Sequence, residues 1–194
     1  MDFAREDRPL PAGYRLVPVR TTYLEMKERP AGAPLPLPPG CEVRKWREPG
    51  TEEYRRLFQA VGNEWGWSGR LLLAEDELKA VLAGETNEIH LLYSSCRIAG
   101  FAELDRGAAG AVEIAYFGLL PDFTGRGLGK FFLDWTVRKA WEEGAGRVWL
   151  HTCEFDHPRA LATYLKAGFR IYSEKTETQP YLKEFLDRRS NPGG

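Results

Sequence analysis

Residues 112–130 read VEIAYFGLLPDFTGRGLGK, and this stretch decides the fold. Its first part, VEIAYFGLL, is apolar at nearly every position, as is typical of a strand buried on both faces of a sheet. A glycine-rich turn follows, and the chain then enters a helical pattern over 126–144, in which Leu133, Val137 and Trp141 recur on one face. A strand, turn and helix in this order favour anion binding, because free backbone N–H groups and the positive end of the helix dipole meet at the turn.

The turn itself supplies groups that suit a phosphate. Gly125, Gly127 and Gly129 permit positive φ and let an oxygen atom come close to the backbone, while Arg126 and Lys130 add positive charge. An ordinary tight turn between a strand and a helix is the alternative. The spacing and the Lys-Ser/Thr ending of a P-loop are missing, and a dinucleotide-binding turn would belong to the first strand of its sheet.

The segments on either side of this stretch alternate between strand and helix patterns. The predicted elements are a strand at 41–46, helices at 51–62 and 75–83, strands at 88–93 and 97–104, then a strand at 147–153, a helix at 161–167 and a strand at 169–173. We therefore expect a single α/β domain whose mixed sheet is largely antiparallel, parallel at the long helix, and flanked by helices.

Residues 1–40 contain eight prolines. Proline fixes φ and lacks an N–H group, so this density excludes a long helix and disfavours a central strand. We expect an arm or an edge strand followed by a connector, in which 14–19 and 21–26 have strand-like spacing and could pack on the body or on a second copy of the chain. The expected division is an arm at 1–40, a domain at 41–180 and a C-terminal tail at 181–194.

Composition excludes several functional classes. A net charge of -1 creates no field that would recruit nucleic acid or an anionic membrane surface. No segment approaches the roughly 18 apolar residues of a membrane span, and the chain start lacks a signal-peptide core. The three cysteines lie far apart and suggest no disulfide framework, so we expect a cytoplasmic protein. The charged runs at 5–8 and 183–189 are expected to be solvated.

Two motifs resemble those of the GNAT superfamily of acyl-CoA N-acyltransferases. The turn at 124–129, TGRGLG, is similar to the family's Gln/Arg-x-x-Gly-x-Gly/Ala motif, with Thr124 in the first place. The segment at 160–169, ALATYLKAGF, is similar to its Ala-x-x-x-Tyr-x-x-x-Gly-Phe helix end. The resemblance implies a GNAT-like fold and transfer of an acetyl group from acetyl-CoA to a primary amine by direct attack, without a covalent enzyme intermediate.

The resemblance also implies where acetyl-CoA would lie. Its diphosphate would bind the turn, and its pantetheine would pair with the preceding strand, where a backbone N–H would polarise the thioester carbonyl. Gly118 would help this close approach. The residues expected to bind the cosubstrate are Phe117, Gly118, Leu119, Thr124, Gly125, Arg126, Gly127, Leu128, Gly129, Lys130 and His157.

Acetyl transfer needs a group that accepts a proton from the amine and one that donates a proton to the departing thiolate. Glu113 is an acid within an apolar strand, where burial disfavours the charged form, and it is our candidate for the base. The alternative is a carboxylate that faces solvent or pairs with an arginine. Tyr164 matches the family's proton donor, and the alternative is a core aromatic residue.

The acceptor is expected to contact Trp65, Trp67, Tyr116 and His151. The two tryptophans lie in a glycine-containing loop and could stack on an aromatic or cationic acceptor, or could merely cover the core. His151 is also a minor candidate for a second base. The spacing of His151, Cys153 and His157 does not match usual zinc sites, so we expect no metal.

The expected partner is therefore a small-molecule or peptide amine, and a homodimer formed through the arm or a late strand is compatible with the sequence. Two other functions stay open at this point. One is a non-catalytic acyl-CoA-binding or regulatory module, and the other is acylation of an alcohol or from a longer acyl donor. The sequence does not identify the amine.

Overall fold

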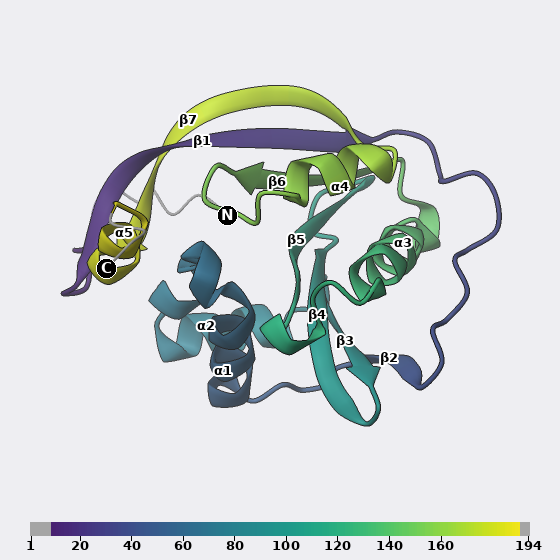
Figure 1. Cartoon of the computed structure of the whole chain (residues 1–194), viewed down its shortest axis with the longest axis horizontal. Coiled ribbons are helices and arrows are strands. Elements are labelled where there is room, and N and C mark those ends of the chain that lie inside the picture. Colours follow the sequence, from purple (N-terminus) through teal and green to yellow (C-terminus); the bar gives the residue numbers. More distant parts are fainter. Residues whose placement is uncertain (1–8, 191–194) are drawn as a thin grey trace.

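The computed structural model describes residues 9–190, which build one seven-stranded sheet with the strand order β2-β3-β4-β5-β6-β1-β7 (Figure 1). All neighbouring strands are antiparallel except β5 and β6, which are parallel. The strands are β1 (Tyr14–Met26), β2 (Cys41–Lys45), β3 (Asn87–Ser94), β4 (Arg97–Asp105), β5 (Ala111–Leu119), β6 (Arg147–Cys153) and β7 (Arg170–Leu182). The predicted α/β domain with a mixed, largely antiparallel sheet is confirmed.

Helices cover both faces of the sheet. They are α1 (Thr51–Gly62), α2 (Glu75–Ala83), α3 (Leu128–Ala140), α4 (Ala160–Lys166) and α5 (Lys183–Ser190). One face packs against α1 and α2 around Tyr54, Phe58 and Phe101, and the other packs against α3 around Phe132 and Leu133. Figure 1 shows α5 on the side of α1 and α2. No helix within residues 9–190 is long and apolar enough to cross a membrane.

The N-terminal strand β1 lies inside the sheet, so the expectation of an arm or edge strand is wrong for this segment. Residues 21–26 pair with β6, and residues 14–25 pair with β7 on the other side. Pro18 lies in the part of β1 that pairs with β7 alone. One edge there carries no partner strand, so a residue without an N–H group can be accommodated.

The C-terminal segment is also more ordered than the sequence predicts. The last strand continues to Leu182, well beyond the predicted end at residue 173, and α5 follows directly. The charged residues within 183–189 are exposed, as expected, but Phe185 and Leu186 are buried. The charged run at 5–8 lies outside the described residues. The division into arm, domain and tail stays a prediction, although β1 and β7 both belong to the one sheet.

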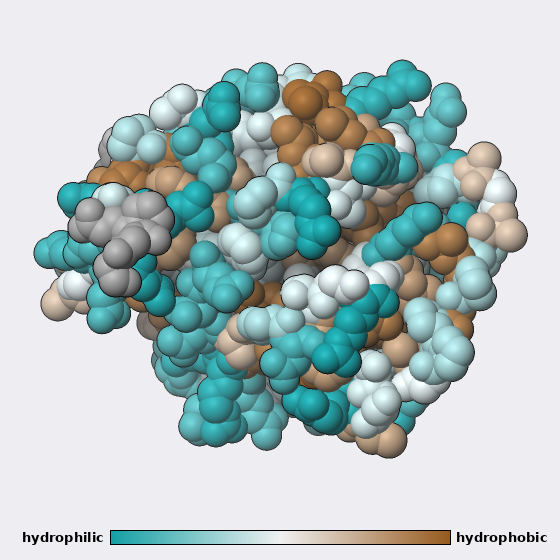
Figure 2. Space-filling model, in the orientation of Figure 1, coloured by the Kyte–Doolittle hydropathy of each residue, from teal (hydrophilic) through white to brown (hydrophobic). Residues whose placement is uncertain are grey.

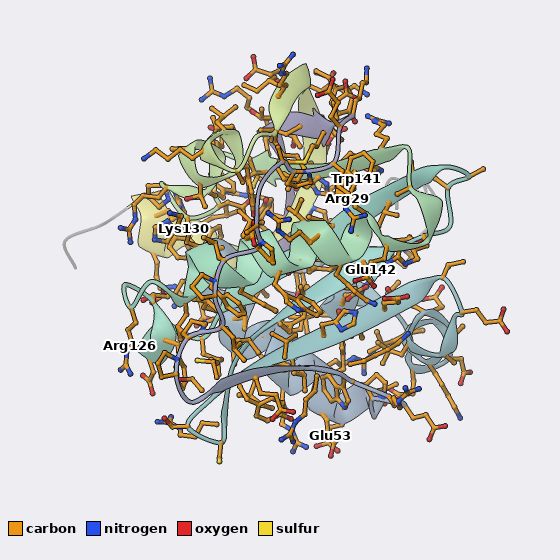
Figure 3. The ribbon with its side chains drawn as sticks, turned by 90° about the vertical axis from the view of Figure 1, so that its right-hand side faces the viewer. Arg29, Glu53, Arg126, Lys130, Trp141 and Glu142 are labelled. Carbon is orange, nitrogen blue, oxygen red and sulfur yellow. The ribbon has the colours of Figure 1, made fainter. Side chains whose placement is uncertain are left out.

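A connector at 27–40 joins β1 to β2, which lies at the opposite edge of the sheet, and it crosses α3 on the way (Figure 3). Two side chains of α3 hold it in place. Asp134 accepts the Leu35 N–H at 2.9 Å, and the Arg138 guanidinium donates to the carbonyls of Gly32 and Ala33 at 3.2 Å each. The connector therefore packs on the body of the protein.

A buried ion pair lies between α1 and the sheet. Glu103 of β4 is fully buried and accepts hydrogen bonds from the Tyr54 hydroxyl and from the Arg70 guanidinium, whose Nε lies at 3.1 Å. Burial is the largest influence on the pKa of Arg70 and lowers it, but Glu103, Tyr116 and Tyr54 together outweigh burial and raise that pKa above the ordinary value. The Arg70 guanidinium also lies 5.2 Å from the centre of the Tyr116 ring. The network therefore supports the side of β5 that faces α1.

Removal of the Glu103 carboxylate should destabilise the fold more than removal of the whole network. In Glu103→Leu, the buried charge of Arg70 loses its carboxylate, and we expect the free energy of unfolding to fall by about 3–5 kcal/mol. In the triple variant with Arg70→Met and Tyr54→Phe, most of that loss should be recovered. Urea denaturation measures both, and a triple variant as unstable as Glu103→Leu would contradict this account.

Candidate functional site

The parallel strands β5 and β6 separate soon after they begin to pair. Their ladder covers three positions, from Ala111 opposite Arg147 to Glu113 opposite Trp149. Immediately afterwards, the register between β5 and β4 shifts, so that Ala115 is an extra residue in β5. A bulge of this kind bends its strand and increases the local twist. The remainder of β5 therefore turns away from β6 (Figure 1).

Within residues 9–190, the separation leaves one edge of β5 without a partner strand at 114–119. The Leu120 N–H donates to the Ala99 carbonyl at 2.8 Å, and backbone direction alternates along a strand. The N–H and C=O groups of Phe117 and Leu119 therefore point toward the open edge, whereas those of Gly118 point toward β4. Both faces at 115–119 are only half-buried, although β5 is an interior strand. Figure 2 shows a hollow in this face of the molecule, between α4 and the turn that enters α3.

Gly118 lies where β5 packs closely against other parts of the protein. A Cβ atom at this position would lie 2.4 Å from Cγ1 of Val61 and 3.3 Å from Cη2 of Trp67. The glycine is therefore required because α1 and the tryptophan loop pack closely on β5. Packing inside the protein therefore accounts for a glycine at this position, and its contact with the cosubstrate stays a prediction.

The glycine-rich turn leads directly into a helix, as predicted, although α3 begins at Leu128 and not at residue 126. Gly125 and Gly127 have φ values of +73° and +78°, and a Cβ atom on either would meet nothing within 4 Å. The first N–H groups of any helix have no acceptor within the helix. At α3 the N-cap is Gly127, which has no side chain that could accept a hydrogen bond from them. Gly129 lies inside α3 without a positive φ, so the expectation of positive φ is wrong for this glycine. The turn is thus an uncapped helix start with open space before it.

The side chains of the turn differ in their availability. The Thr124 hydroxyl donates to the Pro121 carbonyl at 2.9 Å, so it fixes the turn. Arg126 and Lys130 are exposed and lie on opposite sides of the start of α3 (Figure 3). Asp122, the nearest acid in the sequence, pairs with Arg97 at 3.2 Å. Positive potential therefore predominates at the helix start.

Glu113 lies at the point where β5 and β6 separate. Its side chain is 14% exposed, and its Oε1 atom lies 3.5 Å from Nδ1 of His151 on β6. The alternative in which Glu113 pairs with an arginine is not what the structure shows. Burial is the main reason why the pKa of Tyr116 is raised, and the charge of Glu113 adds to this effect. Glu113, His151 and Tyr116 therefore face one region, which lies on the α1 side of the sheet.

Tyr164 of α4 lies on the opposite face. It packs against the core formed by α3, β5 and β6, and its ring meets Phe169 at a centroid distance of 6.3 Å. Burial raises the pKa of the Tyr164 phenol, and the charge of Asp156 adds to the effect. The phenol therefore stays protonated at neutral pH. The open edge of β5 lies between the face of Tyr164 and the face of Glu113.

The two tryptophans of the loop after α1 are placed differently from each other. Trp67 packs on Phe58 and Tyr116 at 5.5 and 5.3 Å, and its indole N–H donates to Asp156 at 3.1 Å. The alternative in which it covers the core thus describes Trp67 well. Trp65 meets the His157 ring at 5.0 Å. Both tryptophans therefore connect the loop after α1 with the loop after β6 through side-chain contacts.

Asp156 is a site residue that the sequence reasoning missed. Its Oδ2 atom accepts the Thr152 hydroxyl at 2.8 Å and the Cys153 N–H at 2.9 Å, while Oδ1 accepts the Trp67 indole. His157 beside Asp156 accepts the Arg159 N–H on Nδ1 at 3.0 Å, so its Nε2 carries the proton in the neutral ring.

The candidate metal ligands are dispersed. His151 faces Glu113, Cys153 contacts the Tyr181 hydroxyl at 3.5 Å, and His157 contacts Trp65. Burial raises the pKa of the Cys153 thiol to about 11. Across residues 9–190, no three His, Cys, Asp or Glu side chains are arranged to hold a metal ion.

Comparison with known proteins agrees with this geometry. A family model described as the acetyltransferase (GNAT) family matches residues 42–169. A Mycobacterium tuberculosis protein named as an uncharacterized N-acetyltransferase is 36% identical over 80 residues, which is 41% of this chain and 51% of that protein. A Mycobacterium bovis protein of the same description matches equally well. The chain thus spans about half the length of the curated relatives it matches.

Solved structures share the fold. A GCN5-related N-acetyltransferase from Sphaerobacter thermophilus has a TM-score of 0.61 at 21% identity, covering 86% of this chain and 53% of that one. A Bacillus subtilis acetyltransferase in complex with CoA has a TM-score of 0.54 at 22% identity, covering 69% of this chain and 78% of that one. The family model covers most of the chain from β2 to the start of β7, and includes β5, the turn and α4. The chain belongs to the acetyltransferase (GNAT) family.

Proposed function

We propose that the protein transfers an acetyl group from acetyl-CoA to a primary amine. One observation carries the proposal: the unpaired edge of β5 leads directly into an uncapped helix start. The edge offers backbone groups to an extended amide chain, and the helix start offers N–H groups and positive potential to a diphosphate. Acetyl-CoA carries both of these chemical groups in this order. A related fold has been solved with CoA bound.

In the proposed complex, the pantetheine lies along β5 and the diphosphate lies on the turn. Phe117 and Leu119 supply the strand-like hydrogen bonds, because their N–H and C=O groups face the open edge. The N–H groups at 125–130 hold the diphosphate, and Arg126 and Lys130 add charge from either side. Thr124 contributes little, because its hydroxyl already donates to Pro121.

The chemistry is direct attack of the amine on the thioester carbonyl. Glu113 accepts a proton from the ammonium group, the amine nitrogen bonds to the acetyl carbon, and the C–S bond breaks. Tyr164 donates a proton to the thiolate as it leaves, and a backbone N–H at Phe117 polarises the carbonyl oxygen. The nitrogen releases its second proton to solvent as the amide forms, and Tyr164 regains a proton from solvent. The two residues lie on opposite faces of the sheet, so each reaches the thioester from its own side of the β5 edge. His151 positions the Glu113 carboxylate.

Substitution in the turn should separate backbone binding from side-chain binding. Gly127→Val introduces a side chain where φ is +78° and fills the space before α3, so we expect the Kd for acetyl-CoA to rise at least about tenfold. Thr124→Ala should change that Kd by less than about twofold. Isothermal titration calorimetry measures both, and equal losses in the two variants would show that the threonine holds the diphosphate.

Substitution of the two proposed catalytic residues tests turnover. Glu113→Gln and Tyr164→Phe should each lower kcat by about 100-fold or more, because each removes one proton transfer. Activity of Glu113→Gln should recover as the pH rises toward the pKa of the amine, since more of the amine is then already deprotonated. Thiol release from acetyl-CoA measures the rates across pH.

Two variants serve as matched controls for these substitutions. Glu184 is exposed on α5, and Tyr14 lies at the start of β1, where burial raises its pKa as it does for Tyr164. Glu184→Gln and Tyr14→Phe should retain full activity. If the wild-type protein bound acetyl-CoA without releasing CoA to any amine, the chain would be a binding module and the proposed function would be wrong.

A further inference from the structure

Three aromatic rings form one cluster on the sheet next to Glu113. Tyr23 of β1 lies directly opposite His151 of β6, and Trp149 is two residues before His151 on the same face. The ring centroids are 5.7–6.5 Å apart, and their planes differ by only 25–35°. Rings oriented so alike favour a further ring in the same orientation. We call Tyr23, Trp149 and His151 the aromatic cluster.

The cluster is partly exposed, and it borders the proposed base at His151. The His151 side chain is 41% exposed and lies 3.5 Å from Glu113. Tyr172 of β7, which is 43% exposed, borders the cluster at 6.0 Å from Tyr23 and at a steeper angle of 59°. This arrangement could not be predicted from sequence, because β1, β6 and β7 come together only in the folded sheet.

The other charged side chains around the cluster are engaged by one another, by a hydroxyl group or by an aromatic ring. Glu25 binds Arg147 at 2.7 Å and Lys27 at 2.9 Å, and Glu177 accepts the Tyr23 hydroxyl at 2.6 Å. The Arg147 guanidinium lies over the rings of Tyr172 and Trp149 at 4.6 and 5.9 Å, and Lys175 lies over Tyr23 at 5.3 Å. Within residues 9–190, the ion-pair partner of Glu113 is the exposed ring of His151, so Glu113 is the carboxylate best placed to receive a cationic amine.

We propose that the acceptor is a monoamine joined by a short chain to a flat aromatic ring. This inference rests on the proposed function, because it places the amine at Glu113. The ring stacks on the aromatic cluster, and the short chain spans the distance from His151 to Glu113. A polyamine needs several carboxylates without partners, whereas the other acids around the cluster hold Arg147, Lys27 and the Tyr23 hydroxyl. Aromatic stacking and one acid are what this surface supplies.

A pair of amines isolates the contribution of the ring. 2-Phenylethylamine and 2-cyclohexylethylamine carry the same primary amine on the same chain, but only the first has a flat ring with π faces. We expect kcat/KM to be about three- to tenfold higher for 2-phenylethylamine, which is the factor that one aromatic pair contributes. The difference should lie mainly in KM, because stacking holds the ring before and during the reaction. Spermidine should be a poorer substrate than both.

Substitutions in and away from the cluster locate the effect. Trp149→Leu should reduce the preference for the aromatic amine to below about twofold, and Tyr172→Leu should reduce it in part. Tyr93 is the matched control, since a guanidinium also lies over its ring, that of Arg44 at 4.9 Å, but it belongs to β3. Tyr93→Leu should leave the preference unchanged. Circular dichroism confirms that each variant is folded.

The outcomes separate this inference from the proposed function. Turnover of both amines with equal kcat/KM, or a preference for spermidine, would overturn the inference and leave acetyl transfer intact. An aromatic preference that survives in folded Trp149→Leu would also overturn it, because the ring would then bind elsewhere. Failure to acetylate any amine would contradict both. Loss of the preference in Trp149→Leu alongside retention in Tyr93→Leu would support the inference.

Discussion

The three-residue ladder between β5 and β6 is the constraint on which the site depends. Had the two strands paired along their full length, the backbone groups of Phe117 and Leu119 would be satisfied within the sheet. The bulge at Ala115 prevents this pairing, because it turns β5 away just beyond Glu113. The proposed base therefore lies where the strands separate, and the glycine-rich turn lies where the open edge ends.

An interior strand that loses a partner leaves backbone groups unpaired on both sides of the gap. Because β1 pairs with the other edge of β6, it does not satisfy those groups, but it holds β6 in the sheet. Residues 21–26 of β1 pair with residues 148–153 of β6. This range includes the part of β6 that lies beyond its ladder with β5. The N-terminal segment thus stabilises the open arrangement from the far side. It also brings Tyr23 beside His151, so the same strand that supports the sheet shapes the surface next to Glu113.

The sequence predicted the local features of the site and missed the non-local ones. The turn, the start of α3 and the position of Glu113 in a central strand follow from neighbouring residues, and the structure agrees with them. The interior position of β1, the packing of Val61 on Gly118 and the three hydrogen bonds to Asp156 join segments far apart in the chain. Proline density argued against an interior strand. It could not reveal that β6 pairs with β1 only beyond Pro18.

Amide hydrogen exchange with and without bound CoA tests most directly whether the open edge of β5 holds the cosubstrate. The account predicts that saturating CoA slows exchange at Phe117 and Leu119 by at least about tenfold, together with the amides at 125–128, because all of them gain acceptors. The amide of Gly118, which already faces β4, should change much less. Protection of the turn without protection of Phe117 and Leu119 would contradict the account, since the diphosphate would then bind while the pantetheine lay elsewhere.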